Sequence, residues 1–185
     1  MKQTRVATRY AKALFDFSVE ENLLEKVYED MILVLKVCDS NKDFKQMLFS
    51  PIIKTKKKQS IVKEIFGKHI NEISLNFIFI IIKKRREVHI EQISNQFIKI
   101  YKNYNGIKTA LFKTAVEIDD NIRKIIVEKL EDFTKSEIEL IEEVKKELIG
   151  GFVLNIDDKQ YDASIKNRIK KLSKEFEKNI YEKGF

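Results

Sequence analysis

The stretch LIGGFVLNI, residues 148–156, decides how the second half of the chain folds. From position 152 onwards, phenylalanine, leucine and isoleucine alternate with other residues, and this spacing places them on one face of a β-strand. Gly150 and Gly151 come directly before the strand, where two residues without a Cβ allow a tight structural turn. The stretch therefore predicts a strand that is entered through a glycine turn.

The residues after this strand predict a turn followed by the last helix of the chain. Asp157 and Asp158 are of a type that favours turns, and Asp162 can cap a helix that starts near Ala163. Apolar residues then recur every three or four positions, which is the spacing of one helical face. They are Ile165, Ile169, Leu172, Phe176 and Ile180.

The first half of the chain carries the apolar spacing of amphipathic helices throughout. In the first helix, this spacing gathers Tyr10, Ala13, Leu14 and Phe17 on one face. A later segment, residues 71–86, is apolar nearly all round, so a helix there has to be covered on every side. Its run of isoleucine and phenylalanine also fits a buried strand. The pattern predicts about six helices before residue 106.

After Gly106 the apolar period changes from helical to alternating. Strands are predicted near residues 109–118 and over residues 137–144, and Asp119 and Asp120 begin a helix between them. We therefore expect a mostly α protein: an N-terminal six-helix bundle, residues 1–105, followed by a small α+β domain, residues 106–185.

The composition is that of a folded protein with a modest positive charge. Thirty-six Lys and Arg against 29 Asp and Glu leave a net charge of +7, which suits nucleic acid, an anionic surface or an acidic protein. The single Cys38 excludes an internal disulfide and falls in an apolar stripe, so a buried, inert thiol is expected. No apolar run reaches the ~20 residues of a spanning helix, and no signal peptide is visible, so we expect no direct membrane insertion.

No pattern of catalytic, cofactor-binding or metal-binding residues stands out. His69 and His89, the two histidines, lie beside neither a nucleophile nor a second ligand at metal spacing. The glycine pair at 150–151 lacks the Lys-Ser/Thr of a phosphate loop. Acid pairs sit where turns and caps use acids. The sequence predicts a protein with no catalytic residues, no cofactor and no metal.

Two clusters of basic residues lie at opposite ends of predicted helices. Residues 83–86, KKRR, close a helix, where the helix dipole favours positive charge. Lys54, Lys56, Lys57 and Lys58 open another helix, where the dipole disfavours it. We expect the second cluster to be solvated surface, with an acidic partner as the alternative. Neither cluster has the interleaved aromatic residues that stack on bases.

Two motifs resemble the same protein family, in the same order and at the same separation. Residues 148–165 are similar, almost residue for residue, to the C-terminal signature of the delta subunit of F-type ATP synthases, whose mitochondrial counterpart is the oligomycin-sensitivity-conferring protein. Residues 9–16, RYAKALFD, resemble the opening helix of that family. The resemblance covers essentially the whole chain, with the middle supported by pattern rather than by a motif.

The resemblance implies a non-catalytic subunit of the peripheral stalk, or stator, of a proton-translocating ATP synthase. One copy in a hetero-oligomeric complex would hold the catalytic head so that it cannot turn with the rotor. The N-terminal bundle would bind the N-terminal helix of an alpha subunit, and the C-terminal domain would bind the C-terminal region of the b subunit. Membrane association would come through these partners, at the cytoplasmic face of the inner (plasma) membrane.

The resemblance also implicates particular residues, because the family binds the alpha helix between its first and fifth helices. Ala13 is small enough to let another helix approach closely. For each residue of this alpha site, the alternative is an ordinary place in the core of the bundle. In the last helix, Phe176, Ile180 and Tyr181 are candidates for the b subunit. Carried onto this chain, the alpha site comprises Tyr10, Ala13, Leu14, Phe17, Phe77, Ile80 and Ile81.

The chain departs from the family pattern in the second domain. Lys145 and Lys146 stand where an Asp-Pro turn is common, and Asp157 and Ala163 stand where glycine is usual. These departures leave the strand limits open. The alternative function is a basic nucleic-acid-binding or ribosome-associated protein, which predicts retention by nucleic acid that falls steeply with salt.

Overall fold

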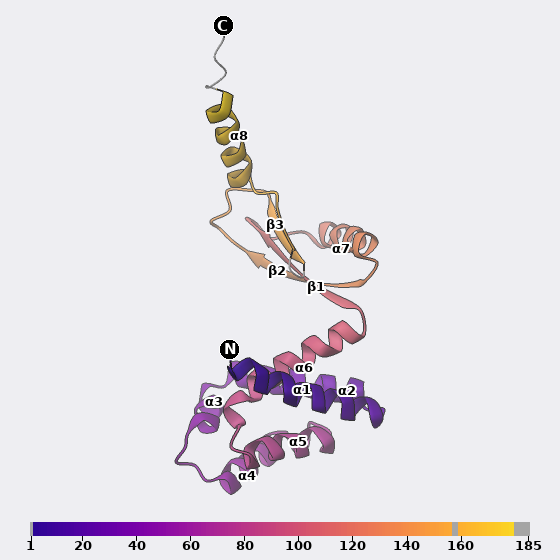
Figure 1. The fold of residues 1–185 in the computed structure, drawn as a ribbon, viewed down its shortest axis with the longest axis vertical. Coiled ribbons are helices and arrows are strands. Elements are labelled where there is room, and N and C mark those ends of the chain that lie inside the picture. The colour runs from indigo at the N-terminus through magenta and orange to yellow at the C-terminus, as the bar shows by residue number, and fades with distance from the viewer. Residues whose placement is uncertain (1, 157–158, 180–185) are drawn as a thin grey trace. The chain divides into compact units, whose positions relative to one another are not determined.

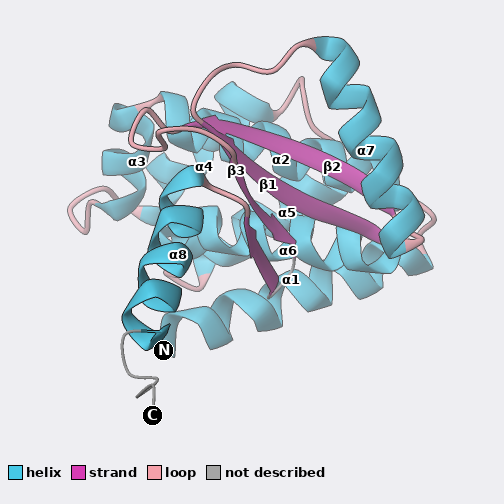
Figure 2. Ribbon diagram, turned by 90° about the horizontal axis from the view of Figure 1, so that it is seen from above, coloured by secondary structure: helices cyan, strands magenta, loops and turns pink. Residues whose placement is uncertain are grey.

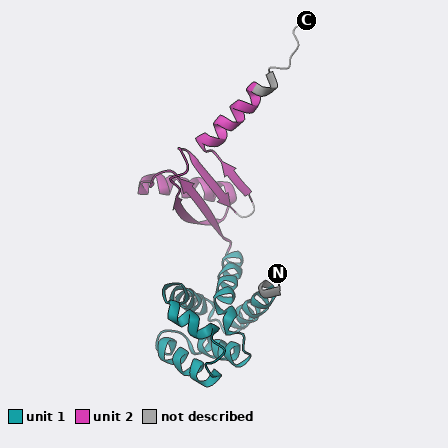
Figure 3. Ribbon diagram, turned by 90° about the vertical axis from the view of Figure 1, so that its left-hand side faces the viewer, with its two compact units in different colours: residues 1–105 teal, residues 106–185 magenta. Residues whose placement is uncertain are grey.

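We describe the fold from a computed structural model, in which residues 2–156 and 159–179 are described (Figure 1). The chain divides into two compact units, Met1–Asn105 and Gly106–Phe185 (Figure 3). In the described ranges, every strand belongs to unit 2, and helices make up most of the rest. This confirms the predicted fold class, a mostly α chain with a helical bundle and a small α+β part.

Unit 1 consists of helices joined by short turns. Its described part contains six α-helices, as the sequence predicted. In the segment 71–86, for which a buried strand was the alternative, residues 72–83 are helical. The amide of Ile73 donates to the side chain of Asn71 at 2.9 Å, which caps that helix at its start. The helices are α1 (Lys2–Glu20), α2 (Leu24–Ser40), α3 (Lys42–Phe49), α4 (Thr55–Phe66), α5 (Glu72–Lys83), the 3-10 turn η1 (Glu87–His89) and α6 (Ile90–Tyr104).

The face of α1 that is buried differs from the face that the large apolar residues predicted: it is turned around the helix axis. Ala7 and Ala11 are almost fully buried, and small side chains let two helices approach closely. Phe15 is also buried, and its ring centroid lies 6.2 Å from that of Phe97 and 5.3 Å from that of Tyr104, both on α6. Because α1 packs on α6 through this face, other apolar residues of α1 are left at the flank of the bundle.

Asp30, a buried acid on α2, fixes the start of α5. Its Oδ2 accepts hydrogen bonds from the Asn71 amide at 2.9 Å and from the Ser74 hydroxyl at 2.5 Å. A carboxylate at a helix N-terminus satisfies amides that the helix itself leaves unpaired and interacts favourably with the helix dipole. These bonds anchor the beginning of α5 to α2.

The expectation that Lys58 is solvated is wrong. Its side chain is 3% exposed, and Nζ donates to the Leu48 carbonyl at 2.7 Å and to Glu87 Oε1 at 2.6 Å. Only the other lysines of this cluster face solvent, because Lys58 points from the first turn of α4 towards η1. The ion pair joins two segments that are 29 positions apart.

Unit 2 is a four-stranded sheet with one helix packed on it and a second helix at its end (Figure 2). The strand order is β2-β1-β3-β4; β1 and β2 are parallel and connected through α7, while β3 is antiparallel to both of its neighbours. The strand expected at 137–144 is found with those limits. The elements are β1 (Ile107–Thr114), α7 (Asp120–Thr134), β2 (Glu137–Val144), β3 (Phe152–Ile156), β4 (Lys159–Asp162) and α8 (Ile165–Asn179).

The core of unit 2 lies between one face of the sheet and α7. Ala110, Phe112, Ile138, Leu154 and Ile156 are buried there, and half-buried residues of α7 cover them. Alternate residues of β1 and β3 point to this face because side chains along a strand alternate between its two sides. The apolar alternation read from the sequence is therefore what forms this core.

The glycine turn holds the end of the sheet against the start of α8. Gly151 has a φ of +78°, and a Cβ there would lie 2.4 Å from the Ala163 carbonyl oxygen. The Ile165 amide donates to the Gly150 carbonyl at 3.0 Å. The helix begins two residues later than expected, and the Ser164 hydroxyl caps it by accepting from Asn167 N at 3.2 Å. The turn thus positions the first residue of α8.

Candidate protein-binding sites

The predicted alpha site falls on neighbouring faces of α1 and α5. The rings of Tyr10 and Phe77 meet edge to face, with centroids 6.5 Å apart, and both residues are half-buried. On the same two helices, Phe17 is 46% exposed, Ile80 is 52% exposed, and Ala13 is exposed. We call these five residues the α1–α5 surface. Large apolar side chains at such exposure leave apolar area for a partner to cover.

The other two residues predicted for this site lie beneath the surface. Leu14 is 2% exposed and Ile81 is 1% exposed, so both belong to the core of unit 1. They support the helices that carry the α1–α5 surface and offer no area of their own to a partner. A direct contact of either residue with a docked helix does not fit this structure, so neither belongs to the α1–α5 surface.

A basic hollow adjoins the α1–α5 surface at the end where α1 begins. Its volume is about 280 Å³, and its walls include Arg5 and Arg9 of α1, Arg86 beyond the end of α5, and Tyr10. Guanidinium groups recognise carboxylates through paired hydrogen bonds. The hollow therefore suits acidic groups at one end of a segment that covers the α1–α5 surface.

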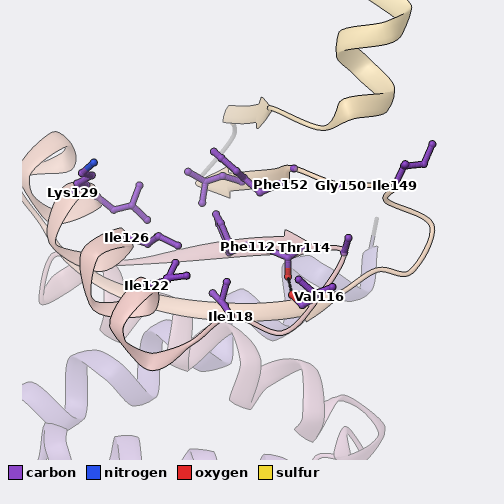
Figure 4. A pocket seen from close by; sticks show the side chains of 14 residues that line it. Phe112, Thr114, Val116, Ile118, Ile122, Ile126, Lys129, Ile149, Gly150 and Phe152 are labelled. Atoms are coloured by element: carbon purple, nitrogen blue, oxygen red, sulfur yellow. Dashed lines mark hydrogen bonds between the residues drawn. The ribbon is translucent and has the colours of Figure 1, made fainter.

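Unit 2 has a larger hollow, of about 650 Å³, that the sequence did not predict (Figure 4). Its walls come from α7, from the sheet and from the glycine turn. The Thr114 hydroxyl donates to the Val116 carbonyl at 2.7 Å, so it is already paired, and Lys129 supplies the one charged side chain of the lining. The apolar lining includes Phe112, Val116, Ile118, Ile122, Ile126, Leu130, Ile149, Phe152 and Leu154.

Helix α8 displays an apolar stripe that no other part of the described chain buries. In Figures 1 and 3 it extends away from the sheet of its own unit. Its opposite side is basic. Ile180 and Tyr181, which were predicted to contact the b subunit, lie outside the described residues. The stripe consists of Ile165, Ile169, Leu172 and Phe176, which are 41%, 56%, 53% and 71% exposed.

The unit 2 hollow and the α8 stripe meet at the glycine turn. Gly150 lines the hollow, and a Cβ on it would lie 2.7 Å from Cδ1 of Ile165, the first residue of the stripe. Ile149, which is 74% exposed, lies next to them. We call the hollow together with the stripe the unit 2 surface. A hint was present in the sequence, because α7 carries more apolar residues than one buried face needs, including Ile122 and Ile125.

The titratable groups with the largest shifts are not activated for chemistry. Burial, and then the nearby Glu91 carboxylate, raise the pKa of the Cys38 thiol to about 11. Burial, and then the hydrogen bond to Glu25, raise the pKa of Tyr101 to about 12. Both groups are therefore neutral at physiological pH, whereas a nucleophilic thiol needs a lowered pKa. His69 is exposed, and His89 lies in the short turn η1.

Among residues 2–156 and 159–179, no group of three or more His, Cys, Asp or Glu side chains is arranged to hold a metal ion. None of the helices in that part combines the length and the apolar composition that crossing a membrane takes.

The fold and its surfaces define a class: a helical bundle and a small α+β unit, each with exposed apolar residues beside basic ones, as in proteins that bind other proteins. The chain belongs to the ATP synthase delta (OSCP) subunit family, whose model matches residues 6–176. This confirms the resemblance read from the two motifs.

Relatives agree with this family, and a solved structure shares the fold. The chain is 36% identical over 181 residues to ATP synthase subunit delta of Christiangramia forsetii, covering 98% of each chain. It is 32% identical over 184 residues to ATP synthase subunit delta of Cytophaga hutchinsonii, covering 97% of this chain and 98% of the relative. A chain of the Toxoplasma gondii mitochondrial ATP synthase hexamer shares the fold, with a TM-score of 0.74 and 20% identity over 92% of this chain and 96% of that one.

Proposed function

We propose that this chain is the non-catalytic peripheral-stalk subunit that links the alpha subunit of the catalytic head to the b subunits. One copy in each complex would keep the head from turning with the rotor, at the cytoplasmic face of the inner (plasma) membrane. The supporting observation is that the rings of Tyr10 and Phe77 join α1 to α5, while Phe17 on α1 and Ile80 on α5 are about half exposed.

Burial of apolar surface supplies enough energy for this task. An amphipathic helix that packs on an apolar face buries a few hundred square ångströms of apolar surface. Each square ångström contributes about 25 cal/mol to the free energy of binding. The total is on the order of 10 kcal/mol before the costs of ordering and of lost translational freedom. A stator subunit needs a tight, long-lived contact and no turnover. The α1–α5 surface is suited to that requirement.

The basic hollow gives the proposed partner a direction. Arg5, Arg9 and Arg86 lie at one end of the α1–α5 surface. Charges at the rim of an interface fix orientation and speed association more than they add affinity. We therefore propose that the alpha N-terminal helix places its apolar stripe on the α1–α5 surface and its acidic end at this hollow.

Substitutions on the α1–α5 surface test this proposal by calorimetry. Ile80→Asp places a charge on the apolar contact, and Ala13→Trp fills the space that an approaching helix needs. Each is expected to weaken binding of a peptide with the alpha N-terminal sequence by at least about tenfold, because losing one buried isoleucine costs roughly 1.5–3 kcal/mol. Thermal unfolding should change little, since both positions are exposed in the free chain.

Ile32→Asp is the matched control for these variants. Ile32 lies on α2 and is 41% exposed, so it receives the same charge at similar exposure outside the proposed site. The affinity of the Ile32→Asp variant for the alpha peptide should equal that of the unaltered chain. Equal affinity of Ile80→Asp, Ala13→Trp and the control would refute the α1–α5 assignment.

For the b subunit, we propose the unit 2 surface as the binding site. The stripe of α8 continues into the apolar hollow, so one partner segment could cover both. The double variant Leu172→Gln and Phe176→Gln is expected to weaken binding of the b C-terminal region by at least about tenfold, through loss of apolar burial. Surface plasmon resonance with the immobilised b fragment measures this effect.

The control for this variant is Lys174→Gln, on the polar side of the same helix. Both variants should keep the circular dichroism of the unaltered chain, because the substituted side chains are exposed in it. If the double variant and the control bind the b fragment equally well, α8 does not contact the b subunit.

A further inference from the structure

A third hollow lies in unit 1, where the loop after α3 leads into α4, and none of its residues belongs to the α1–α5 surface. Its volume is about 540 Å³. Two of the apolar side chains that line it are largely exposed to solvent: Phe49 is 54% exposed and Ile52 is 89% exposed. An apolar side chain exposed to this degree beside a hollow offers a contact for an apolar group of a partner.

Three cations at this hollow are not neutralised by the described chain, besides the Lys58–Glu87 pair that also lines it. Lys54, Lys56 and Arg85 line it, and none of them forms an ion pair or side-chain hydrogen bond within residues 2–156 and 159–179. The N-terminus of α4 adds the positive end of its dipole, and Lys54, the residue before that helix, provides no capping acceptor. The hollow therefore attracts negatively charged groups.

Glu87, one of the residues that line the hollow, has one buried oxygen without a partner among the described residues. Oε1 of this carboxylate accepts from the buried Lys58. The other oxygen, Oε2, is buried and has no hydrogen-bond partner in the described part of the chain. Buried carboxylate oxygens in folded proteins are nearly always paired. Because this oxygen is buried, a ligand in the hollow does not reach it, and a suitable ligand is defined by negative charge and an apolar group.

We propose that this hollow binds an acidic peptide segment of a partner protein. Carboxylates of the segment pair with Lys54, Lys56 and Arg85, and an apolar side chain packs on Phe49 and Ile52. A nucleic-acid phosphate backbone also satisfies the cations, but it has no apolar side chain to pack on Phe49 and Ile52. The peptide is therefore the better match.

The test uses the full chain, labelled with nitrogen-15, and two short capped peptides. In one peptide glutamate and leucine alternate; in the other, glutamine replaces every glutamate. The acidic peptide is expected to shift the amide signals of Ile52, Thr55 and Glu87 and to bind at least about tenfold more tightly than the neutral one. The triple variant Lys54→Glu, Lys56→Glu and Arg85→Glu should lose this preference.

The matched control carries the same change of charge on another face: Lys26→Glu, Lys36→Glu and Lys42→Glu, all exposed on α2 and α3. It should keep the preference for the acidic peptide. Ile52→Ser should weaken binding several-fold without changing the thermal unfolding of the chain. Binding of the alpha peptide to the α1–α5 surface should be the same in Ile52→Ser, which leaves the charge unchanged, so the two proposals fail separately.

Three results would overturn the proposal. The first is equal binding of the acidic and the neutral peptide. The second is an equal loss of affinity in the two triple variants, which would mean that only overall charge matters. The third is a single-stranded oligonucleotide that shifts Ile52, Thr55 and Glu87 at lower concentration than the acidic peptide, which would make the hollow a nucleic-acid site.

Discussion

Replacing Lys58 with methionine is expected to lower the free energy of unfolding of unit 1 by about 3–5 kcal/mol, because it removes one partner of a buried ion pair. Lys58 is 3% exposed, and the side chain of its partner Glu87 is 11% exposed. Methionine fills similar space but leaves the Glu87 carboxylate and the Leu48 carbonyl without their donor. Urea unfolding followed by circular dichroism measures the loss.

A double variant separates the ion pair from simple packing. Lys58→Met combined with Glu87→Met removes both charges, and replacing a buried pair by apolar groups is often nearly neutral. The double variant should therefore be more stable than Lys58→Met alone. Lys57→Met, at an exposed position of the same turn, should stay within about 0.5 kcal/mol of the unaltered chain. If the double variant is no more stable than the single one, the uncompensated charge is not the cause.

Gly151→Ala is expected to lower the stability of unit 2 by about 2–4 kcal/mol, because two costs add there. A residue with a side chain is strained at a φ of +78°, and its Cβ would lie 2.4 Å from the Ala163 carbonyl oxygen. The backbone that joins β3 to the start of α8 would have to move. Hydrogen exchange of the β3 amides, followed by NMR, reports the stability of this unit.

Gly106→Ala is the matched control, because it shares only the first of these costs. Gly106 has a φ of +70°, but a Cβ there meets nothing within 4 Å. Its cost should be about 1 kcal/mol, the penalty of the left-handed conformation alone. Equal protection of the β3 amides in both variants would show that the close approach to Ala163 does not matter.

Much of the fold could be predicted because local signals decide it. Asp119 precedes α7 as expected, and the alternation at residues 137–144 marks β2 with its observed limits. Strand β4 was not predicted, since its four residues, Lys159–Asp162, are all exposed and carry no apolar alternation. Such a strand is specified by its pairing with β3, which a local pattern does not contain.

The candidate sites were predictable only in part, because burial depends on which helices meet. The sequence pattern gave weight to large apolar residues, but α1 packs on α6 through Ala7 and Ala11. This leaves Phe17 exposed while Leu14, also predicted for the surface, is buried. The position of Lys58 depends on Glu87, which is distant in the sequence. The unit 2 hollow is formed by α7, the sheet and the glycine turn together, so the pattern of no single segment predicts it.

The central claim is that the α1–α5 surface grips a helix of the alpha subunit, and NMR on the full chain tests it most directly. On titration with a peptide of the alpha N-terminal sequence, the amide and side-chain signals of Tyr10, Ala13, Phe17, Phe77 and Ile80 should shift together and saturate, with an affinity that falls less steeply with salt than nucleic-acid binding does. Shifts confined to α2 and α3, or no saturable shift at these five residues, would contradict the claim.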